Sequence, residues 1–246
     1  MVIERGGKTI FGASVGVMML DTQFPRIYGD IANANTWPFP IQYRIVKGAS
    51  PDIVVRKKAE GLLEGFIQAG KDLVAHGADG LTTNCGFLAL IQDKVRNAID
   101  VPVATSSLMQ VPMVNSMLGN DRRAGIITIS KEHLTDEHLR LANVPLDTPI
   151  VGTEGGREFT HKILDDLPEI DFSLCLEDLK DAARDMVNNH KDVGGIVLEC
   201  TNMAPYAADI RKITKLPVYS IYTHICWLQS GLVPRRFPYQ LDDPRL

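Results

Sequence analysis

The chain alternates between short apolar runs and longer segments in which apolar residues recur every three or four positions. Such runs are typical of strands buried on both faces of a parallel sheet, and the three- to four-residue spacing is typical of amphipathic helices. Strands are predicted over 12–20, 42–46, 78–82, 101–105, 124–129, 149–152, 195–198 and 216–219. Helices are predicted over 52–76, 87–98, 107–118, 133–141, 176–190, 203–213 and 222–231. Strands that alternate with helices predict a parallel α/β architecture.

One long stretch, residues 23–50, interrupts this alternation with prolines, asparagines and glycines. Irregular segments of this length in compact domains are often functional lids or binding loops, so we expect this one to contribute to substrate specificity. Arg26 is a candidate clamp for a substrate carboxylate, because a guanidinium binds carboxylates through paired hydrogen bonds, although surface salt bridges are commoner. Trp37 and Phe39 are candidates either to line a cleft or to bury against the rest of the protein.

Composition places the chain among ordinary globular proteins. Of its 246 residues, 45% are hydrophobic and 23% are charged, which suits one large α/β domain or two lobes. The formal net charge of -4 argues against a nucleic-acid partner, which selects a basic surface. No apolar stretch is long enough to span a membrane. The segment 10–20 resembles a signal peptide, but it has no cleavage pattern and is better explained as a buried strand, so we expect a cytoplasmic protein.

Four cysteines are too sparse for a disulfide framework, and none forms a CxxC pair or has a histidine at zinc-finger spacing. No metal is therefore expected. Cys85 and Cys200 differ from the other two because each follows a predicted buried strand and precedes a helix-like segment. Cys175 and Cys226 lack this context and are interpreted as core residues.

The segments around Cys85 and Cys200 belong to an internal repeat. Gly195, Cys200 and Pro217 each lie 115 residues after a residue of the same type, at positions 80, 85 and 102. Three matches at one offset indicate two duplicated halves, each with a strand, a cysteine-bearing turn, a helix, a strand and a helix. Because ligands bind at strand-end turns of parallel sheets, we expect both cysteines to face one cleft.

Two opposed thiols suggest acid–base chemistry at carbon. A cysteine at a helix N-terminus has its thiolate stabilised by nearby N–H groups, so one thiol can remove a proton and the other can return one. Proton removal next to a carbonyl also requires donors that stabilise the resulting enediolate. Polar or small residues beside the two cysteines are candidates for this role: Thr83, Asn84, Gly86, Thr201 and Asn202.

At this point the residues resemble a known family, the cofactor-independent aspartate/glutamate racemase superfamily. Cys200-Thr201-Asn202 resembles its second-half motif, in which threonine and a polar residue follow the cysteine. Asn84-Cys85-Gly86 matches the first-half motif loosely, because Asn-Thr usually follows that cysteine in amino-acid racemases. Asp21 and Thr22 end the first strand, where glutamate racemases carry an Asp-Ser pair.

The resemblance implies two similar lobes with parallel sheets flanked by helices, a pseudo-twofold axis, a site in the cleft between the lobes, and no cofactor. It also implies that the last strand of each half crosses over, so that 1–100 and 216–246 form one lobe and 101–215 the other. A small-molecule carboxylic acid is the expected substrate. The oligomeric state stays open, with a homo-oligomer as one option.

Together these features favour an isomerase: a racemase or epimerase, with Cys85 and Cys200 as the two acid/base residues. The loose first-half motif leaves the substrate open between aspartate, glutamate, a hydantoin-like cyclic amide and another acid. Single-cysteine decarboxylases or cis–trans isomerases of the same superfamily and a non-catalytic binding protein are the alternatives. Glu199 and His224 are further candidates for the site, the first to orient or deprotonate a neighbour and the second because it follows the last strand.

Overall fold

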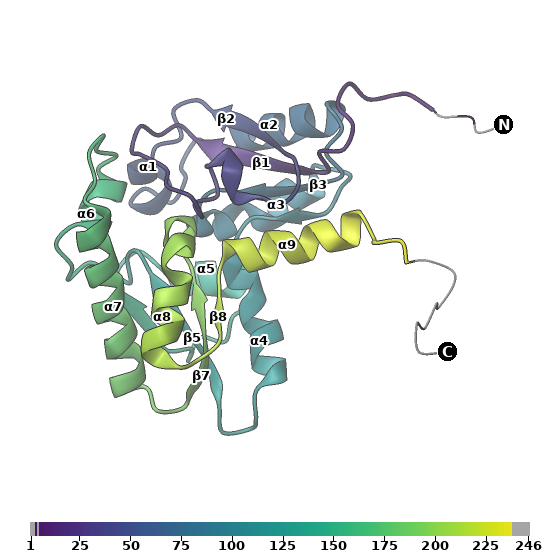
Figure 1. Ribbon diagram of the computed structural model, residues 1–246. Helices are drawn as coiled ribbons and strands as arrows, with labels where there is room; N and C mark the ends of the chain where they lie inside the picture. The colour runs from purple at the N-terminus through teal and green to yellow at the C-terminus, as the bar shows by residue number, and fades with distance from the viewer. Residues whose placement is uncertain (1–2, 4, 238–246) are drawn as a thin grey trace, which may run out of the picture.

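The computed structural model describes residues 3 and 5–237, which form two parallel sheets of four strands each (Figure 1). The first sheet has the order β2-β1-β3-β4 and the second the order β6-β5-β7-β8. The strands are β1 (Val15–Leu20), β2 (Ile41–Val46), β3 (Gly80–Thr83), β4 (Val103–Ala104), β5 (Arg123–Thr128), β6 (Ile150–Gly152), β7 (Val193–Leu198) and β8 (Val218–Tyr219). The predicted α/β fold with two parallel sheets is confirmed.

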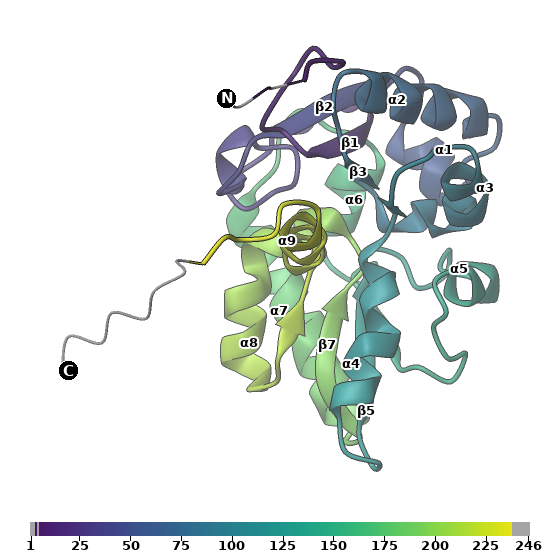
Figure 2. The same ribbon diagram turned by 90° about the vertical axis from the view of Figure 1, so that its right-hand side faces the viewer.

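Helices cover both sheets. The α-helices are α1 (Pro51–Val55), α2 (Leu63–Ala75), α3 (Gln92–Asn97), α4 (Val111–Met117), α5 (Asp136–Leu141), α6 (Phe159–Leu164), α7 (Phe172–Asn189), α8 (Ala207–Thr214) and α9 (Ile221–Leu232). Short 3₁₀ helices are η1 (Ala34–Thr36), η2 (Gly86–Ile91), η3 (Ser107–Gln110) and η4 (Thr201–Tyr206). Figure 2 shows the first sheet above and the second below, with α9 running between them.

The internal repeat is visible in the strand register. Leu81 pairs with Val103 across β3 and β4, and Ile196 pairs with Val218 across β7 and β8. These two pairs are related by the same offset of 115 residues that relates the cysteines. Because both sheets have the same strand order, the ends of β3 and β7 occupy equivalent places in the two halves.

The crossover between the halves differs from the expectation. β4 stays in the first sheet and β8 in the second, whereas α4, which follows β4, packs on β5 and α9, which follows β8, packs on β3. The exchanged elements are therefore helices, not strands. The division of the chain into one lobe of 1–100 plus 216–246 and a second lobe of 101–215 stays a proposal. The sheets modify it at two strands, because β4 belongs to the first sheet and β8 to the second.

β1 shows why its sequence is apolar throughout. Met18 and Leu20 face the large core that runs through both lobes, and Val15 and Val17 face a second cluster with Ile225 of α9. A strand buried on both faces needs apolar residues at every position. Trp37 joins the second cluster, where its indole N–H donates to the carbonyl of Ile31 at 3.1 Å, so it buries against the first lobe.

The single helix predicted over 52–76 is wrong, because two helices flank an irregular segment. Ser50 caps α1 by accepting a hydrogen bond from Ile53 N–H, but Lys58, Ala59 and Gly61 all have positive φ. An α-helix cannot continue through left-handed residues. The break places α1 at the mouth of the site, as shown below.

Helix α6 was missed in the sequence, and α7 begins four residues earlier than predicted. Asp171 caps α7 by accepting hydrogen bonds from the N–H groups of Ser173 and Leu174. α6 is short, and the N–H groups at its start, residues 157–159, donate hydrogen bonds to Asp178 on α7, which is far from them in the sequence. No local pattern reveals a cap supplied by another helix.

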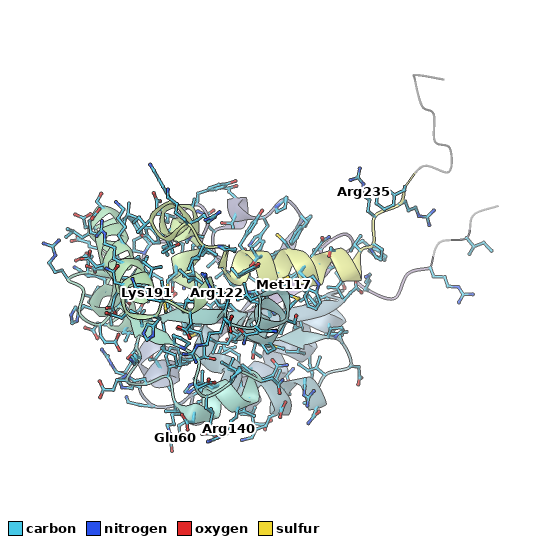
Figure 3. All side chains as sticks on the ribbon, turned by 90° about the horizontal axis from the view of Figure 1, so that it is seen from below. Glu60, Met117, Arg122, Arg140, Lys191 and Arg235 are labelled. Carbon is cyan, nitrogen blue, oxygen red and sulfur yellow. The ribbon has the colours of Figure 1, made fainter. Side chains whose placement is uncertain are left out.

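Most charged side chains lie on the outside, and Figure 3 shows Glu60 and Arg140 at the edge of the molecule viewed from below. Across residues 3 and 5–237, none of the helices is both long enough and apolar enough to cross a membrane.

Candidate active site

Cys85 and Cys200 lie at equivalent positions in the two halves. Each has extended backbone geometry, follows the end of a central strand (β3 or β7) and directly precedes a 3₁₀ helix (η2 or η4). Cys200 is buried and Cys85 is partly buried. Both line one pocket, so the prediction that the repeat brings two cysteines to a common cleft holds geometrically.

The pocket is lined by both lobes and is narrow, with a cavity volume of about 20 Å³. The first lobe contributes Leu20, Thr22, Phe24, Arg26, Pro51, Val55, Asn84 and Cys85. The second contributes Ile129, Ile163, Leu164, Glu199, Cys200 and Asn202. Both lobes contribute apolar side chains, and the polar groups among them are the two thiols, two amides, one hydroxyl, one guanidinium and one carboxyl group, a combination that suits a small acid.

Asn84 is anchored so that its amide N–H groups remain available. Its Oδ1 accepts a hydrogen bond from Leu20 N–H at 2.7 Å, and its backbone carbonyl accepts one from Thr201 Oγ1 at 2.6 Å. Within residues 3 and 5–237, its Nδ2 is buried without an acceptor. Buried polar groups are rarely left unpaired, so an unpaired donor in a pocket indicates a polar group on a ligand.

Asn202 and Arg26 converge on Asp30, a buried carboxylate in the long loop. Asn202 Nδ2 donates to Asp30 Oδ2 at 2.6 Å, and Arg26 Nη1 lies 3.2 Å from Asp30 Oδ1. Arg26 Nη2 also donates to Thr22 Oγ1 at 2.8 Å, and its guanidinium stacks over the Phe24 ring at 4.1 Å. These contacts hold one cation at the wall of the pocket.

Glu199 is fully buried between the end of β7 and the end of β5. Its Oε2 accepts a hydrogen bond from Thr128 Oγ1 at 2.8 Å and a long one from Ile129 N–H at 3.4 Å. Its Oε1 has no donor or acceptor among the residues that the structure describes. Burial raises the pKa of this carboxyl group to about 7, because desolvation penalises the charged form more than the two hydrogen bonds stabilise it.

Both thiols are protonated at neutral pH in this state of the pocket. Burial, with the charge of Glu199 as the second cause, raises the pKa of Cys85 to about 12, and the same causes raise the pKa of Cys200 well above its ordinary value. The N–H groups of Phe87 and Leu88 act in the opposite direction on Cys85. Because a thiolate is the reactive form, an ionised Glu199 adds to the effect of burial and lowers the reactivity of both cysteines further.

The pocket is covered by contacts between the lobes. Asp166, just after α6, accepts a hydrogen bond from Gln23 N–H at 2.9 Å, and its carbonyl accepts one from Gln23 Nε2 at 2.9 Å. Arg56, at the end of α1, pairs with Asp165 at 2.9 Å. α6 thereby packs against α1, and Figure 1 shows it reaching up from the second lobe. The break between α1 and α2 allows α1 to take this position.

Several predicted site residues lie outside the pocket lining. Asp21 is exposed and Gly86 is buried beneath Glu199. Thr83 Oγ1 donates to the carbonyl of Thr105 at 2.6 Å, and Thr201 bonds Asn84, so both threonines support the site from behind. Direct substrate contact by these residues stays a prediction, and of the four only Thr83 and Thr201 use their hydroxyl groups in hydrogen bonds within the protein.

His224 also lies away from the pocket. It is buried on α9, stacks on Trp227 with ring centroids 6.0 Å apart, and has a pKa lowered to about 4 by burial. Cys175 is buried in the core, as predicted, and Cys226 is partly buried. Among residues 3 and 5–237, no group of three or more His, Cys, Asp or Glu side chains is arranged to hold a metal ion.

Asp30, Phe24 and the α6 residues Ile163 and Leu164 were not identified from the sequence. Asp30 lies in a loop whose path has no periodic signal, and its partner Asn202 is 172 residues away. The apolar pair on α6 has the character of ordinary core residues. Only the packing of α6 onto the first lobe turns them into a wall of the pocket.

The chain is similar in sequence to curated lyases, although no protein-family model matches it. It is 27% identical over 244 residues to a dimethylsulfoniopropionate lyase of Durusdinium sp. clade D, covering 95% of this chain and 77% of that protein. It is 28% identical over 219 residues to dimethylsulfoniopropionate lyase 7 of Emiliania huxleyi, covering 85% of this chain and 64% of that protein. The chain thus spans less than two thirds of the Emiliania relative.

Solved structures share the fold. A glycine-to-cysteine mutant of arylmalonate decarboxylase matches with a TM-score of 0.59 at 15% identity, covering 92% of this chain and 97% of that one. Allantoin racemase from Pseudomonas fluorescens matches with a TM-score of 0.55 at 14% identity, covering 89% and 90%. Picrophilus torridus aspartate racemase matches with a TM-score of 0.51 at 10% identity, covering 92% and 96%. The chain thus shares the fold of these decarboxylase and racemase structures, which is the fold that the resemblance implied.

Proposed function

We propose that this chain is a lyase that removes a proton from the carbon next to a carboxylate and expels a leaving group from the adjacent carbon, with dimethylsulfoniopropionate as substrate. The observation that carries the proposal is the pair of thiols, Cys85 and Cys200, facing one small pocket. The choice of substrate is supported by the names of the two relatives, one of them matched over 95% of this chain.

The chemistry needs one base. A pocket thiolate takes the proton from the carbon beside the carboxylate, and the C–H electron pair forms a carbon–carbon double bond through an enediolate. The adjacent carbon–sulfur bond breaks, and its electron pair leaves with sulfur as neutral dimethyl sulfide. Acrylate remains, and the thiol has gained the proton. General base catalysis of this kind typically contributes about 10²- to 10⁴-fold to the rate.

The pocket supplies what this elimination requires. Asn84 Nδ2, which has no acceptor among residues 3 and 5–237, can donate to a carboxylate oxygen, and Arg26 provides a positive charge at the wall. Phe24, Ile163 and Leu164 exclude water from the reacting carbon, which strengthens these electrostatic contacts. Because dimethyl sulfide leaves as a neutral molecule, the leaving group needs no proton, and the second thiol is not required as an acid.

A racemase is the second candidate, and the placement of the thiols favours it. Cys85 comes from the first lobe and Cys200 from the second, so a substrate carbon between them would have one acid/base group on each face. Inversion requires both groups, because the proton must leave one face and return to the other. The single-cysteine decarboxylase and the non-catalytic binding protein have no observation of this kind in their favour.

The test is the release of dimethyl sulfide from dimethylsulfoniopropionate, measured in the headspace by gas chromatography, with acrylate followed by NMR. Cys85→Ala and Cys200→Ala would be compared with Cys226→Ala, a partly buried cysteine outside the pocket that should keep wild-type activity. We expect one pocket variant to lose at least about 10²-fold in rate. Full activity in both pocket variants would refute the proposal.

The same NMR experiment in D₂O separates the two candidates. Exchange of the proton next to the carboxylate in aspartate, glutamate or allantoin, abolished by either cysteine variant and without dimethyl sulfide release, would replace the lyase by the racemase. Release of dimethyl sulfide that survives loss of one thiol would favour elimination.

A further inference from the structure

Glu199 occupies a position where an ionised side chain costs free energy, because it is removed from water. It lies directly before Cys200, is fully buried, and follows a strand whose residues are all buried. Burying a carboxylate without full hydrogen bonding costs several kcal/mol, so such groups are retained where they serve a purpose. Its Oε2 is held by Thr128 and Ile129 at the end of β5, and its Oε1 is the oxygen without a partner among the residues that the structure describes.

The protein keeps space for this carboxyl group on the opposite lobe. A Cβ atom added at Gly86 would overlap both Oε1 and the backbone oxygen of Glu199. The residue after Cys85 must therefore be glycine, because the backbone of position 199 occupies the space of a Cβ atom and the Glu199 carboxyl group lies against the same point. The close approach of the two strand-end turns accounts for Gly86, where the racemase pattern has a larger residue.

Two unpaired buried groups line the same pocket. Among the residues that the structure describes, the buried side-chain atoms without a partner are Asn84 Nδ2, Glu199 Oε1 and three ring nitrogens of His138 and His224. The histidines lie outside the pocket, whereas Asn84 and Glu199 both line it. A ligand carboxylate would satisfy both groups if one of its oxygens accepted from Asn84 and the other accepted from a protonated Glu199.

We infer that Glu199 binds the substrate as a neutral acid: it takes up a proton when a carboxylate enters the pocket and donates that proton, through Oε1, in a hydrogen bond to the carboxylate. This inference rests on the proposed function in one respect, namely that the substrate of the thiols is a carboxylate. The hydrogen bond strengthens as the carboxylate becomes an enediolate, because the donor faces a growing negative charge in a site shielded from water.

The surroundings of Glu199 support this charge state. The thiols of Cys85 and Cys200 are protonated, and the Arg26–Asp30 pair is neutral as a unit. From β5 only Thr128 and Ile129 face the carboxyl group, and the α6 residues that line the pocket are apolar. A ligand carboxylate is then the only further charge added to the pocket, and two carboxylates sharing one buried site cannot both be ionised without a large cost.

Neutral Glu199 also serves the thiols. An ionised Glu199 raises the pKa of both Cys85 and Cys200, so its protonation on substrate binding prevents the thiols from facing a second carboxylate beside that of the substrate. Glu199 is therefore both a contact to the substrate and a switch on the acidity of the base.

The experiment measures proton uptake with acrylate, the expected product, as the probe. Calorimetric titrations at pH 8 in two buffers of different ionisation enthalpy give the protons taken up per acrylate bound. The wild type should take up close to one proton, and its affinity should fall about tenfold per pH unit above pH 7. Glu199→Gln, whose amide N–H replaces the acid O–H, should bind acrylate with no proton uptake and no pH dependence.

The matched control is Glu177→Gln, the same change at an exposed glutamate paired with Lys180, which should behave as the wild type. Affinity for acrylate that rises with pH, or does not change with it, would overturn the inference, because binding would then not require a protonated Glu199. Proton uptake that persists in Glu199→Gln would also overturn it.

A second readout does not depend on whether Glu199→Gln folds, because it uses the wild-type protein. The infrared carbonyl band of a buried protonated carboxyl group should titrate near pH 7 in the wild type and persist to higher pH with acrylate. Thr128→Val removes a hydrogen bond that favours the ionised form, so it should move the midpoint upward. A midpoint that acrylate leaves unchanged overturns the inference. Absence of dimethyl sulfide release, with acrylate-linked proton uptake intact, would refute only the proposed substrate.

Discussion

Burial of Glu199 predicts that Glu199→Gln stabilises the protein at alkaline pH. The pKa of this carboxyl group rises from an ordinary 4.5 to about 7 on folding because burial penalises its charged form. A shift of roughly 2.5 units corresponds to about 3 kcal/mol at about 1.4 kcal/mol per unit. Glutamine has the shape of the neutral acid and cannot ionise, so it escapes this penalty.

The sign follows from proton binding. Between pH 4.5 and about 7 the folded state holds a proton on Glu199 that the unfolded chain has already released. The free energy of unfolding therefore falls as pH rises through this window and is flat outside it. The advantage of Glu199→Gln over the wild type should be near zero at pH 4.5, grow through neutrality, and level off at about 3 kcal/mol above pH 8.

Urea unfolding, followed by circular dichroism from pH 5 to 9, measures this difference directly. Glu177→Gln again provides the control, because its side chain lies at the surface and its pKa is lowered by Lys180, so no gain at high pH is expected. A stability difference between Glu199→Gln and wild type that stays constant across this range would refute the reasoning, since it would mean that Glu199 titrates alike in both states.

Two further substitutions test the architecture of the site. Gly86→Ala should destabilise the protein by about 1–3 kcal/mol and lower its activity, because the added methyl group displaces the Glu199 carboxyl group. The control is Gly119→Ala, at a glycine with open space around it, which should change neither stability nor activity. Thermal unfolding and activity assays measure the two effects. Asp30→Ala should cost about 3–5 kcal/mol in urea unfolding by leaving the Arg26 guanidinium without its buried partner, and a cost below about 1 kcal/mol would contradict that account.

The periodic pattern of the sequence predicted most strands and the repeat, but it failed where helices end for non-local reasons. The segment 56–62 keeps an apolar spacing compatible with a helix, yet Lys58 and Ala59 adopt positive φ because the chain turns there to place α1 against α6. α6 itself was missed because Asp178 caps it from α7.

Within the site, prediction succeeded for residues tied to the repeat and failed for residues placed by the loop. Cys85, Asn84, Cys200 and Asn202 follow directly from the ends of β3 and β7, and all four line the pocket. Asp30 could not be found, because its role depends on where an irregular loop returns to meet Asn202.

The sequence by itself determined the parallel α/β class, the duplicated halves and the two cysteines of a common site. These follow from short-range regularities: the period of apolar positions and a repeated offset of 115 residues. Only the tertiary structure decided that helices cross between the halves, and that Glu199 faces Gly86 with one oxygen unpaired. The contacts of α9 with β3 and of Glu199 with Gly86 join residues more than a hundred positions apart, and their energies depend on burial, which a linear pattern does not record.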